Sequence, residues 1–398
     1  MKILVLDANQ RSALAATRSL GSKGVHVVVA DETRETLAGS SKYCSESFQY
    51  PSPYNNSKDF ITTLKEEAIR RSIHVIFPMT EISTYFLLKY RHQFTGVNIP
   101  FAPFEAFELL TDKWRLSELA HQLDIPIPMT YYIKNNGDLS DIYSKLKFPV
   151  VLKPYRSRVL LDGKWRATSL KYANSVAELE NTVVNTKSFN QYPFLLQEYI
   201  QGEGRGIFTL YNQGEPIIFF AHRRLREKPP SGGVSVLSES IEVDPHIREI
   251  AEKILNYVKW HGVAMVEFKV SSEGIPYLME VNARFWGSLQ LAMDAGVDFP
   301  EILMRIAKGE TVEPVFNYKL GVRTRWLWGD VDSLLMILFK NRTSLHLPKD
   351  HPGRIRAIFD FLRFFEKDLH YEIESRDDLR PSLHELSQRF RLASPGHH

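Results

Sequence analysis

Residues 263–284, VAMVEFKVSSEGIPYLMEVNAR, contain two carboxylates whose spacing suits a shared metal ion. Two apolar runs flank a turn at Ser271 to Gly274, which is the pattern of a β-hairpin. A hairpin centred on this turn puts Glu267 directly opposite Glu280, with Asn282 on the same face. Like charges that face each other repel, so the pair needs a bound cation or one protonated carboxyl group. Carboxylate and amide oxygens are ligands that Mg²⁺ prefers.

The alternative for this hairpin is a solvated face on which both carboxylates point into water. Met265 and Leu278 would share the face, and two apolar neighbours argue against full exposure. Both readings stay open on the residues alone.

Two lysines have positions that suit phosphate binding. Lys153 ends the apolar run PVVLKP, so its ammonium emerges at the end of a buried strand. Lys113 follows Asp112, which can cap a helix, and a cation at a helix start is slightly unfavourable unless an anion is bound nearby. For each lysine the alternative is a solvated ammonium.

Two further segments can contact a small anionic ligand. In FLLQEYIQGEGRG, backbone groups from Glu198 to Ile200 can recognise a purine edge, and Glu203 can accept from ribose hydroxyls; a plain strand entering a turn is the alternative. In AHRRLREKPPSGGVS, Arg223 leads a basic cluster before a Gly-Gly turn. We expect a flexible cationic loop over a small anionic substrate there, with a solvated basic loop or a nucleic-acid contact as alternatives.

Composition limits the classes of protein. The chain has 398 residues, 43% hydrophobic and 24% charged, with a formal net charge of +3. These values suit two to three globular domains and give no general case for nucleic acid as a partner. The single cysteine excludes an internal disulfide and a cysteine-based zinc site. We expect no membrane span, no signal peptide and a cytoplasmic protein.

The elements that must position these residues begin with a β-α-β pattern. Strands at 2–6 and 25–30 flank a helix at 11–22, and another strand is expected at 74–78. This order predicts a parallel, Rossmann-like sheet, although the turn DANQRS lacks the glycine pattern of dinucleotide binding.

Strands and helices alternate through the middle of the chain, and a mostly helical segment follows. In that segment an apolar stripe has helical spacing, and we expect it to pack on the protein's own core rather than on a membrane or a partner. The stripe consists of Ile355, Ile358, Phe359, Leu362 and Phe365.

Taken in order, six motifs resemble the ATP-grasp superfamily, in the branch of predicted carboxylate–amine ligases. They are TDKWRL, PVVLKP, QEYIQGEG, HRRLRE with PSGG, MVEFK and LMEVNARFWGS. The resemblance covers about residues 1 to 325. It implies an α/β and α+β chain, in which a Rossmann-like N-terminal domain is followed by a two-subdomain ATP-grasp fold and a helical C-terminal extension. The Rossmann-like domain is expected at 1–105 and the small subdomain at 106–195. The large subdomain is expected at 196–329 and the helical extension at 330–398.

The resemblance also implies roles. Lys113 and Lys153 would contact the phosphates of ATP, Glu198 and Ile200 adenine, and Glu203 the ribose. Glu267, Glu280 and Asn282 would hold Mg²⁺ or Mn²⁺, and Arg284 and Arg223 would touch the transferred phosphate or the acyl group. The implied reaction activates a small-molecule carboxylate with ATP for attack by an amine. A homodimer is compatible with the sequence, which does not fix the oligomeric state.

One segment departs from the family pattern. After Lys153 the family has a glycine-rich loop over the phosphates, whereas YRSRVLLDGKWRATS has only Gly163. Arg156 or Arg158 would then take over the phosphate contact. The departure also leaves an alternative function, a nucleotide-binding regulatory protein that does not catalyse ligation.

Overall fold

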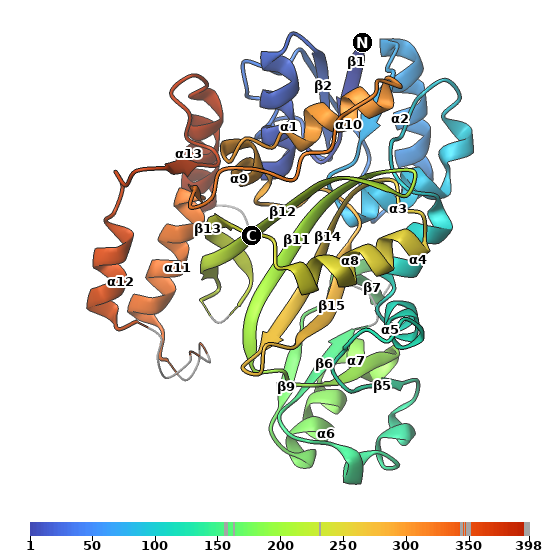
Figure 1. The fold of residues 1–398 in the computed structure, drawn as a ribbon, viewed down its shortest axis with the longest axis vertical. Coiled ribbons are helices and arrows are strands. Elements are labelled where there is room, and N and C mark those ends of the chain that lie inside the picture. Colours follow the sequence, from blue (N-terminus) through green and yellow to red (C-terminus); the bar gives the residue numbers. More distant parts are fainter. Residues whose placement is uncertain are drawn as a thin grey trace.

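A computed structural model shows three larger sheets along the long axis of the molecule, with helices around them (Figure 1), and the described residues also form one two-stranded sheet. The structure describes residues 1–154, 158–161, 164–230, 232–342, 345, 347 and 352–393, with the backbone alone at 136, 158–161, 164–167, 392 and 393. Within these residues, no helix is long and apolar enough to span a membrane.

The N-terminal domain is the predicted parallel sheet, in the order β3-β2-β1-β4. Short apolar runs form β1, β2 and β4, which are buried on both faces as parallel strands inside a sheet require, whereas the edge strand β3 is ESFQ and only partly buried. The strands are β1 (Lys2–Val5), β2 (His26–Asp31), β3 (Glu46–Gln49) and β4 (Val75–Phe77). The helices are α1 (Arg11–Ser22), α2 (Ser57–Arg71) and α3 (Glu81–Lys89), with a 3-10 turn at Arg91–Gln93.

A small sheet, β5-β10-β6-β9, lies at the opposite end of the molecule. Its strands are β5 (Thr130–Ile133), β6 (Val150–Pro154), β9 (Lys171–Ala173) and β10 (Phe194–Glu198). Around it lie α6 (Val176–Asn185), α7 (Lys187–Gln191), 3-10 turns at Asn136–Leu139 and Tyr143–Lys145, and a hairpin of β7 (Arg158–Leu161) and β8 (Lys164–Ala167). The sheet has a hydrophobic core of its own, which includes Leu152 and Leu196.

The large sheet lies between these two units and has the order β15-β14-β11-β12-β13-β16-β17. Its strands are β11 (Gly202–Asn212), β12 (Glu215–Lys228), β13 (Val234–Ile241), β14 (Gly262–Ser271), β15 (Pro276–Asn282), β16 (Arg323–Arg325) and β17 (Leu369–Tyr371). Nearby helices are α4 (Phe104–Thr111), α5 (Lys113–Gln122), α8 (Pro245–Tyr257), α9 (Leu289–Asp294) and α10 (Phe299–Ala307).

One hydrophobic core joins the N-terminal domain to the large sheet. It also includes Leu110 of α4 and Leu116 of α5, two helices that the sequence assigned to the small subdomain. The small sheet and the large sheet thus have separate hydrophobic cores. The chain passes from the core of the large sheet to that of the small sheet near residue 126, where Leu278 N donates to Pro126 O. The domain boundaries themselves stay a prediction.

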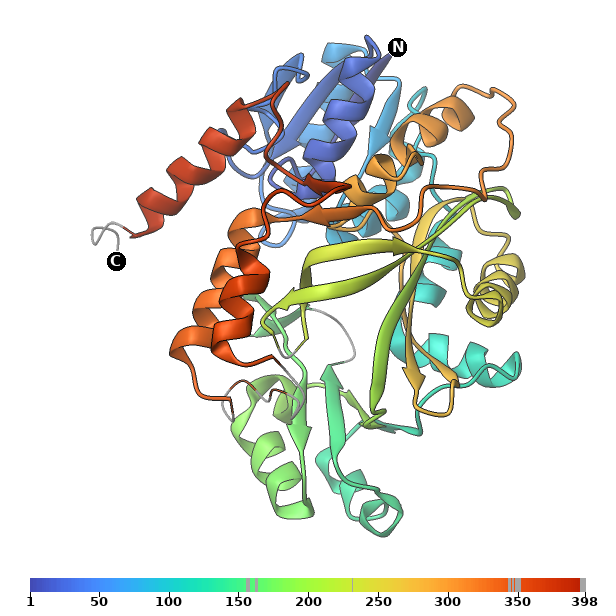
Figure 2. The same ribbon diagram turned by 60° about the vertical axis from the view of Figure 1, so that its left-hand side comes forward.

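The C-terminal segment is helical, as expected, and adds the edge strand β17 to the large sheet. Its helices are α11 (Leu327–Phe339), α12 (Arg354–Phe361) and α13 (Arg380–Ala393). Figure 2 shows α11 and α12 beside the β12–β13 end of the sheet and α13 beside the N-terminal domain.

The expectation that the apolar stripe from Ile355 to Phe365 packs on the core is wrong. Ile355, Phe359 and Phe365 are 73%, 66% and 98% exposed. α12 instead turns Ala357 toward the sheet, while the ring of Phe361 stacks on Arg325. Helical spacing identified an apolar face but not the face that is covered.

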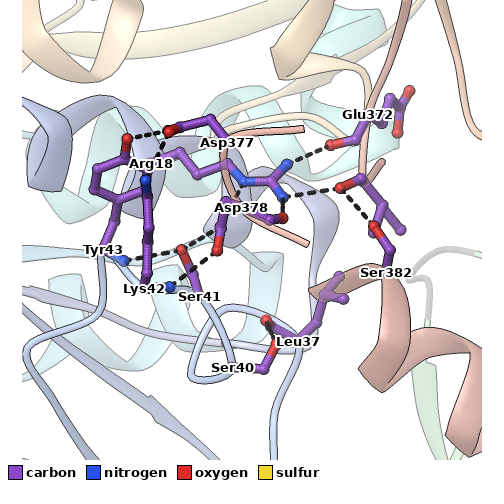
Figure 3. Close-up of polar contacts among 11 residues, drawn as sticks. Arg18, Leu37, Ser40, Ser41, Lys42, Tyr43, Glu372, Asp377, Asp378 and Ser382 are labelled. Atoms are coloured by element: carbon purple, nitrogen blue, oxygen red, sulfur yellow. Dashed lines mark hydrogen bonds and ion pairs between the residues drawn. The ribbon is translucent and has the colours of Figure 1, made fainter. Parts of the chain in front are cut away.

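A cluster of ion pairs fastens the C-terminal segment to the N-terminal domain (Figure 3). The Arg18 guanidinium donates to Asp378 Oδ2 at 2.9 Å and to the carbonyl oxygens of Glu372, Ile373 and Asp378. Ser41 Oγ also donates to Asp378, at 2.6 Å. We call this group, Arg18 with Ser41 and residues 372–378, the seam.

Candidate functional site

The hairpin of β14 and β15 has the predicted pairing at the carboxylates. Glu267 pairs with Glu280 and Met265 pairs with Asn282, around a turn in which Gly274 has φ +81°. Between this turn and Glu267 the register shifts by one residue, so Leu278 pairs with Phe268 rather than with Lys269 as predicted. Both carboxylates and the amide share one face of the large sheet, and Met265 on that face is buried, so this is not a fully solvated face.

The amide of Asn282 lies between the two carboxylates. Its Nδ2 donates to Glu267 Oε1 and to Glu280 Oε1, each at 3.1 Å. Burial and the charge of Glu280 raise the pKa of Glu267, whereas the Lys113 ammonium lowers that of Glu280. The two carboxyl groups therefore differ in proton affinity.

Lys113 and Lys153 reach this face from different elements. Asp112 caps α5 by accepting from Trp114 N and Arg115 N, and this cap holds Lys113 at the helix start. Lys113 Nζ donates to Glu280 Oε2 at 2.6 Å. Lys153 comes from β6 of the small sheet and is only 7% exposed.

The Lys153 ammonium lacks a neutralising partner. Burial, followed by the repulsion of Lys113, lowers the pKa of Lys153 to about 8, despite the nearby carboxylates. No carboxylate of the described residues lies within ion-pair distance of it. An uncompensated buried cation of this kind favours binding of an anion.

Arg284 also lies at this face, and its Nη2 donates to Asn282 Oδ1 at 3.1 Å. The structure does not bring Arg223 to the same place: Arg223 forms an ion pair with Glu239 on β13. Its neighbour Arg224 donates from Nη2 to Glu267 Oε2 at 3.1 Å.

A β-bulge explains why Arg224 takes the position expected for Arg223. The β11–β12 register shifts by one residue between Leu210 and Tyr211. Without this shift, the pairing of Asn212 with Glu215 would continue and would place Arg223 opposite Gly204, on the Glu267 face. A one-residue shift exchanges the two faces of a strand. The hairpin turn at Gly214 is visible in the sequence, but the bulge has no clear sequence signal.

The basic segment is a strand rather than the expected flexible loop. β12 runs to Lys228 and pairs with β13 along its basic end, with register shifts between Arg224 and Glu227. Each basic side chain also has a carboxylate partner: Glu239 for Arg223, Glu227 and Glu267 for Arg224, Asp330 for Arg226 and Asp332 for Lys228. Paired charges of this kind make a poor phosphate-binding patch for nucleic acid.

Glu198 and Ile200 lie where the small sheet ends and the large sheet begins. Glu198 is the last residue of β10, and its N–H donates to Met129 O at 2.8 Å. The backbone of Ile200 makes no backbone hydrogen bond within the described part of the chain, so its N–H and C=O remain available to a ligand.

Glu203 lies on the other face of β11. Gly206 pairs with Glu267 and so lies on the Glu267 face. Side chains alternate between the two faces of a strand, so Glu203, three positions before Gly206, lies on the opposite face. There the Glu203 carboxylate accepts from Arg205, which also pairs with Asp244, the N-cap of α8. The structure therefore does not bring Glu203 to the face of the carboxylate pair. Arg156, Gly163 and the side chain of Arg158 lie outside the described residues.

The carboxylate pair fits a divalent cation by its chemistry. The described residues hold no group of three or more His, Cys, Asp or Glu side chains suited to a metal ion. Two carboxylates and one amide oxygen are instead the sparse protein ligand set of Mg²⁺, which usually keeps water and phosphate oxygens as further ligands.

Comparison with known proteins agrees with this geometry. Residues 190–329 match the family described as "ATP-grasp in the biosynthetic pathway with Ter operon". The carbamoyl phosphate synthase large chain of Thermoanaerobacter sp. is 25% identical over 239 residues, which cover 57% of this chain and 21% of that protein. The chain thus spans about a fifth of the length of the curated relatives it matches.

Solved structures share the fold over most of the chain. The L-amino acid ligase of Bacillus licheniformis matches with a TM-score of 0.62 and 17% identity, covering 77% of this chain and 73% of that one. The biotin carboxylase of Campylobacter jejuni matches with a TM-score of 0.64 and 17% identity, covering 81% and 74%. N5-carboxyaminoimidazole synthetase of Staphylococcus aureus with ADP matches with a TM-score of 0.63 and 17% identity, covering 81% and 80%.

Residues 190–329 thus match an ATP-grasp family, and the solved structures share the fold over most of the chain. The resemblance seen in the sequence, and the expected order of a Rossmann-like domain, two subdomains and a helical extension, are thereby confirmed.

Proposed function

We propose that the protein is an ATP- and Mg²⁺-dependent ligase that joins a small carboxylic acid to an amine. The observation that carries the proposal is the facing pair Glu267 and Glu280, bridged by the Asn282 amide and contacted by Lys113. This arrangement concentrates metal-binding oxygens and phosphate-binding cations at one place. Similarity in fold to an L-amino acid ligase supports the reaction class.

The chain's own residues divide the work of binding ATP. Lys113 and Lys153 bind the phosphates, and the backbone from Glu198 to Ile200 binds the adenine edge. Glu267, Glu280 and Asn282 would hold Mg²⁺ or Mn²⁺, which neutralises phosphate charge when bound. No role for Glu203 at the ribose is retained, because its carboxylate lies on the opposite face of β11 from Glu267.

The reaction has two steps. An oxygen of the substrate carboxylate attacks the γ-phosphorus of ATP, the bond to the β-phosphate oxygen breaks, and ADP leaves an acyl phosphate behind. The amine nitrogen then attacks the acyl carbon, phosphate leaves, and the nitrogen gives up a proton as the amide forms.

Positioning and charge neutralisation are what such a transfer requires from a protein. Arg284 lies beside Asn282 and is placed to hold the transferred phosphoryl group. Arg224, rather than Arg223, supplies the second guanidinium.

The proposal is tested by measuring ADP release with pools of small acids and amines, with the products of active pools identified by mass. We expect at least one acid–amine pair to stimulate ADP formation and to yield an amide or peptide-like product. EDTA should abolish the signal. Tight ATP binding without ADP release across the full panel would contradict the ligase and favour a nucleotide-binding regulatory protein.

A further inference from the structure

A cavity of about 360 Å³ lies between the large sheet and the C-terminal helices α11 and α12. Its volume is that of a pocket for a small molecule. One wall comes from β12, β13 and β16, and the other from side chains such as Ile337 of α11 and Ala357 of α12. Figure 2 shows these two helices facing that end of the sheet. The C-terminal extension therefore completes a cavity that the large sheet alone would leave open.

The cavity wall is rich in arginine side chains, most of which are paired with carboxylates in or behind the wall. Its described lining residues include five arginines, at 224, 226, 323, 325 and 363, against three carboxylates, at 227, 360 and 366. Behind this wall, Asp330 accepts from Arg226 Nε at 2.8 Å and from Arg325 Nε at 2.7 Å. One carboxylate thus serves two guanidinium groups, and this buried triad keeps a net positive charge.

Arg325 is held rigidly at this wall. It is 0% exposed, its guanidinium stacks on the rings of Phe361 and Phe364, and Nη2 donates to Phe361 O at 2.9 Å. Nη1 is buried and has no hydrogen-bond partner among the described residues. A buried N–H donor of a charged group is costly when it is left unpaired, so the arrangement favours an anionic ligand.

The cavity adjoins the carboxylate pair through Arg224. This side chain lines the cavity and also donates to Glu267 Oε2 at 3.1 Å. The wall also includes the aliphatic side chains of Leu225, Leu237 and Ile337. A ligand with more than one acidic group and an aliphatic part would find partners for both in this lining.

We infer that this cavity binds the acid substrate and that the substrate is a small dicarboxylic acid with an aliphatic chain. One carboxylate of the substrate lies near Arg224, and it is the one that ATP phosphorylates in the proposed reaction. Arg226 and Arg325 hold the other carboxylate. The assignment of the first carboxylate rests on the proposed ligase function. The binding of a dicarboxylate does not, because the triad and the aliphatic wall need neither ATP nor Mg²⁺.

Calorimetric titration of the full chain, without nucleotide or metal, tests the inference. The probes are succinate, glutarate and adipate, each compared with the monocarboxylate of equal carbon number, butyrate, valerate or hexanoate. We expect at least one dicarboxylate to bind saturably and at least tenfold more tightly than its monocarboxylate. The absence of saturable binding for all three dicarboxylates would overturn the inference.

Two variants locate the binding. Arg226→Gln removes one guanidinium while Asp330 keeps Arg325 as its partner, so the fold should survive. Ile337→Trp fills the cavity from α11. Each should weaken dicarboxylate binding at least tenfold, whereas Arg305→Gln, which removes a surface pair with Glu310, should leave it unchanged. Equal binding by wild type and both cavity variants would place the ligand elsewhere and contradict the inference.

The two proposals fail separately. Binding of a dicarboxylate in this cavity, without ADP formation on any acid–amine pair, would refute the ligase and leave the dicarboxylate site standing. ADP formation with an unchanged KM for the acid in Arg226→Gln and Ile337→Trp would refute the cavity and leave the ligase standing.

Discussion

Two groups of buried charges differ in how completely they are neutralised. In the seam, Arg18 is surrounded by one carboxylate and three carbonyl oxygens, and Asp378 in turn accepts from Arg18, Ser41 Oγ and Lys42 N. At the carboxylate pair, Glu267 faces Glu280 directly, and the nearby Lys153 has no carboxylate partner among the described residues. The Arg18–Asp378 pair is complete without a ligand, whereas the carboxylate pair is not. Elsewhere in the seam, Glu374 keeps two buried carboxylate oxygens that have no hydrogen-bond partner among the described residues.

The difference shows in the pKa values. Burial raises the pKa of Asp378, but the hydrogen bonds from Ser41 and Lys42 and the charge of Arg18 outweigh it and lower the pKa overall. Burial instead prevails at Lys153, whose pKa falls to about 8, and at Glu267, whose pKa rises. Burial also raises the pKa of Glu372 and Glu374 in the seam to about 7, so the contrast holds for the Arg18–Asp378 pair and not for the whole seam. What distinguishes the carboxylate pair is that shifted groups of both signs, Lys153 and Glu267, occur at one face.

The largest expected effect is on Glu280. Glu280→Gln removes one carboxylate of the pair and the partner of Lys113, so we expect Mg²⁺-dependent ADP formation to fall about 1000-fold, since metal and electrostatic groups of this kind supply several kcal/mol to the transition state. Steady-state ADP release with an active acid–amine pair measures it. Glu203→Gln, on the opposite face of β11, is the matched control and should keep nearly full activity. Unchanged turnover in Glu280→Gln would contradict the assignment of Glu280 as a metal ligand.

The seam should respond in stability rather than in activity. Asp378→Asn leaves Arg18 without its carboxylate, and loss of one partner of a buried ion pair costs about 3 kcal/mol of unfolding free energy. Urea unfolding measures the change. Asp377→Asn, whose side chain is 61% exposed, is the control and should cost under about 1 kcal/mol. If Asp378→Asn abolished ADP formation in protein that remains folded, the seam could not be purely structural.

Lys153 should make ATP binding depend on pH. Its pKa of about 8 lies below the ordinary value of 10.5, so in the free protein the ammonium loses its proton as the pH rises through 8. The neutral amine does not attract phosphate, and the Kd for ATP should therefore increase about tenfold between pH 7 and pH 9. Lys153→Arg stays charged over this range and should give a flatter profile. A parallel rise in both proteins would show that another group is responsible.

The smallest effect distinguishes two neighbours on β12. Arg224→Gln removes a charge-assisted hydrogen bond to Glu267 and should lower kcat about fivefold, the equivalent of about 1 kcal/mol. Arg223→Gln affects only the pair with Glu239 and should change kcat less than twofold. The opposite ranking would mean that the bulge at Leu210 does not set the face of β12 in solution.

The parts of the site that could be predicted from the sequence are local. The pairing of Glu267 with Glu280 was predicted from one continuous segment with a glycine turn, although the register shift next to Glu267 was not. The cap of α5 follows from Asp112 immediately before Lys113. The parallel order of the N-terminal sheet follows from its β-α-β succession.

What could not be predicted depends on distant parts of the chain or on an irregular strand. The bulge in β11–β12 puts Arg224 instead of Arg223 on the Glu267 face, and no residue pattern predicts this bulge. The cavity arises only when α11 and α12 fold against β12, over 100 residues earlier in the chain, as the Arg226–Asp330 pair shows. Likewise, the spacing of Ile355 and Phe359 could not reveal that their face of α12 stays exposed.

The central claim is that ATP activates the substrate's carboxylate. Its most direct test uses an acid substrate found by the ADP screen, labelled with ¹⁸O in both carboxylate oxygens, followed by mass analysis of the released phosphate. The proposed reaction transfers one carboxylate oxygen to phosphorus, so the account predicts phosphate that carries one ¹⁸O atom alongside ADP. Unlabelled phosphate, or release of AMP and pyrophosphate, would contradict it.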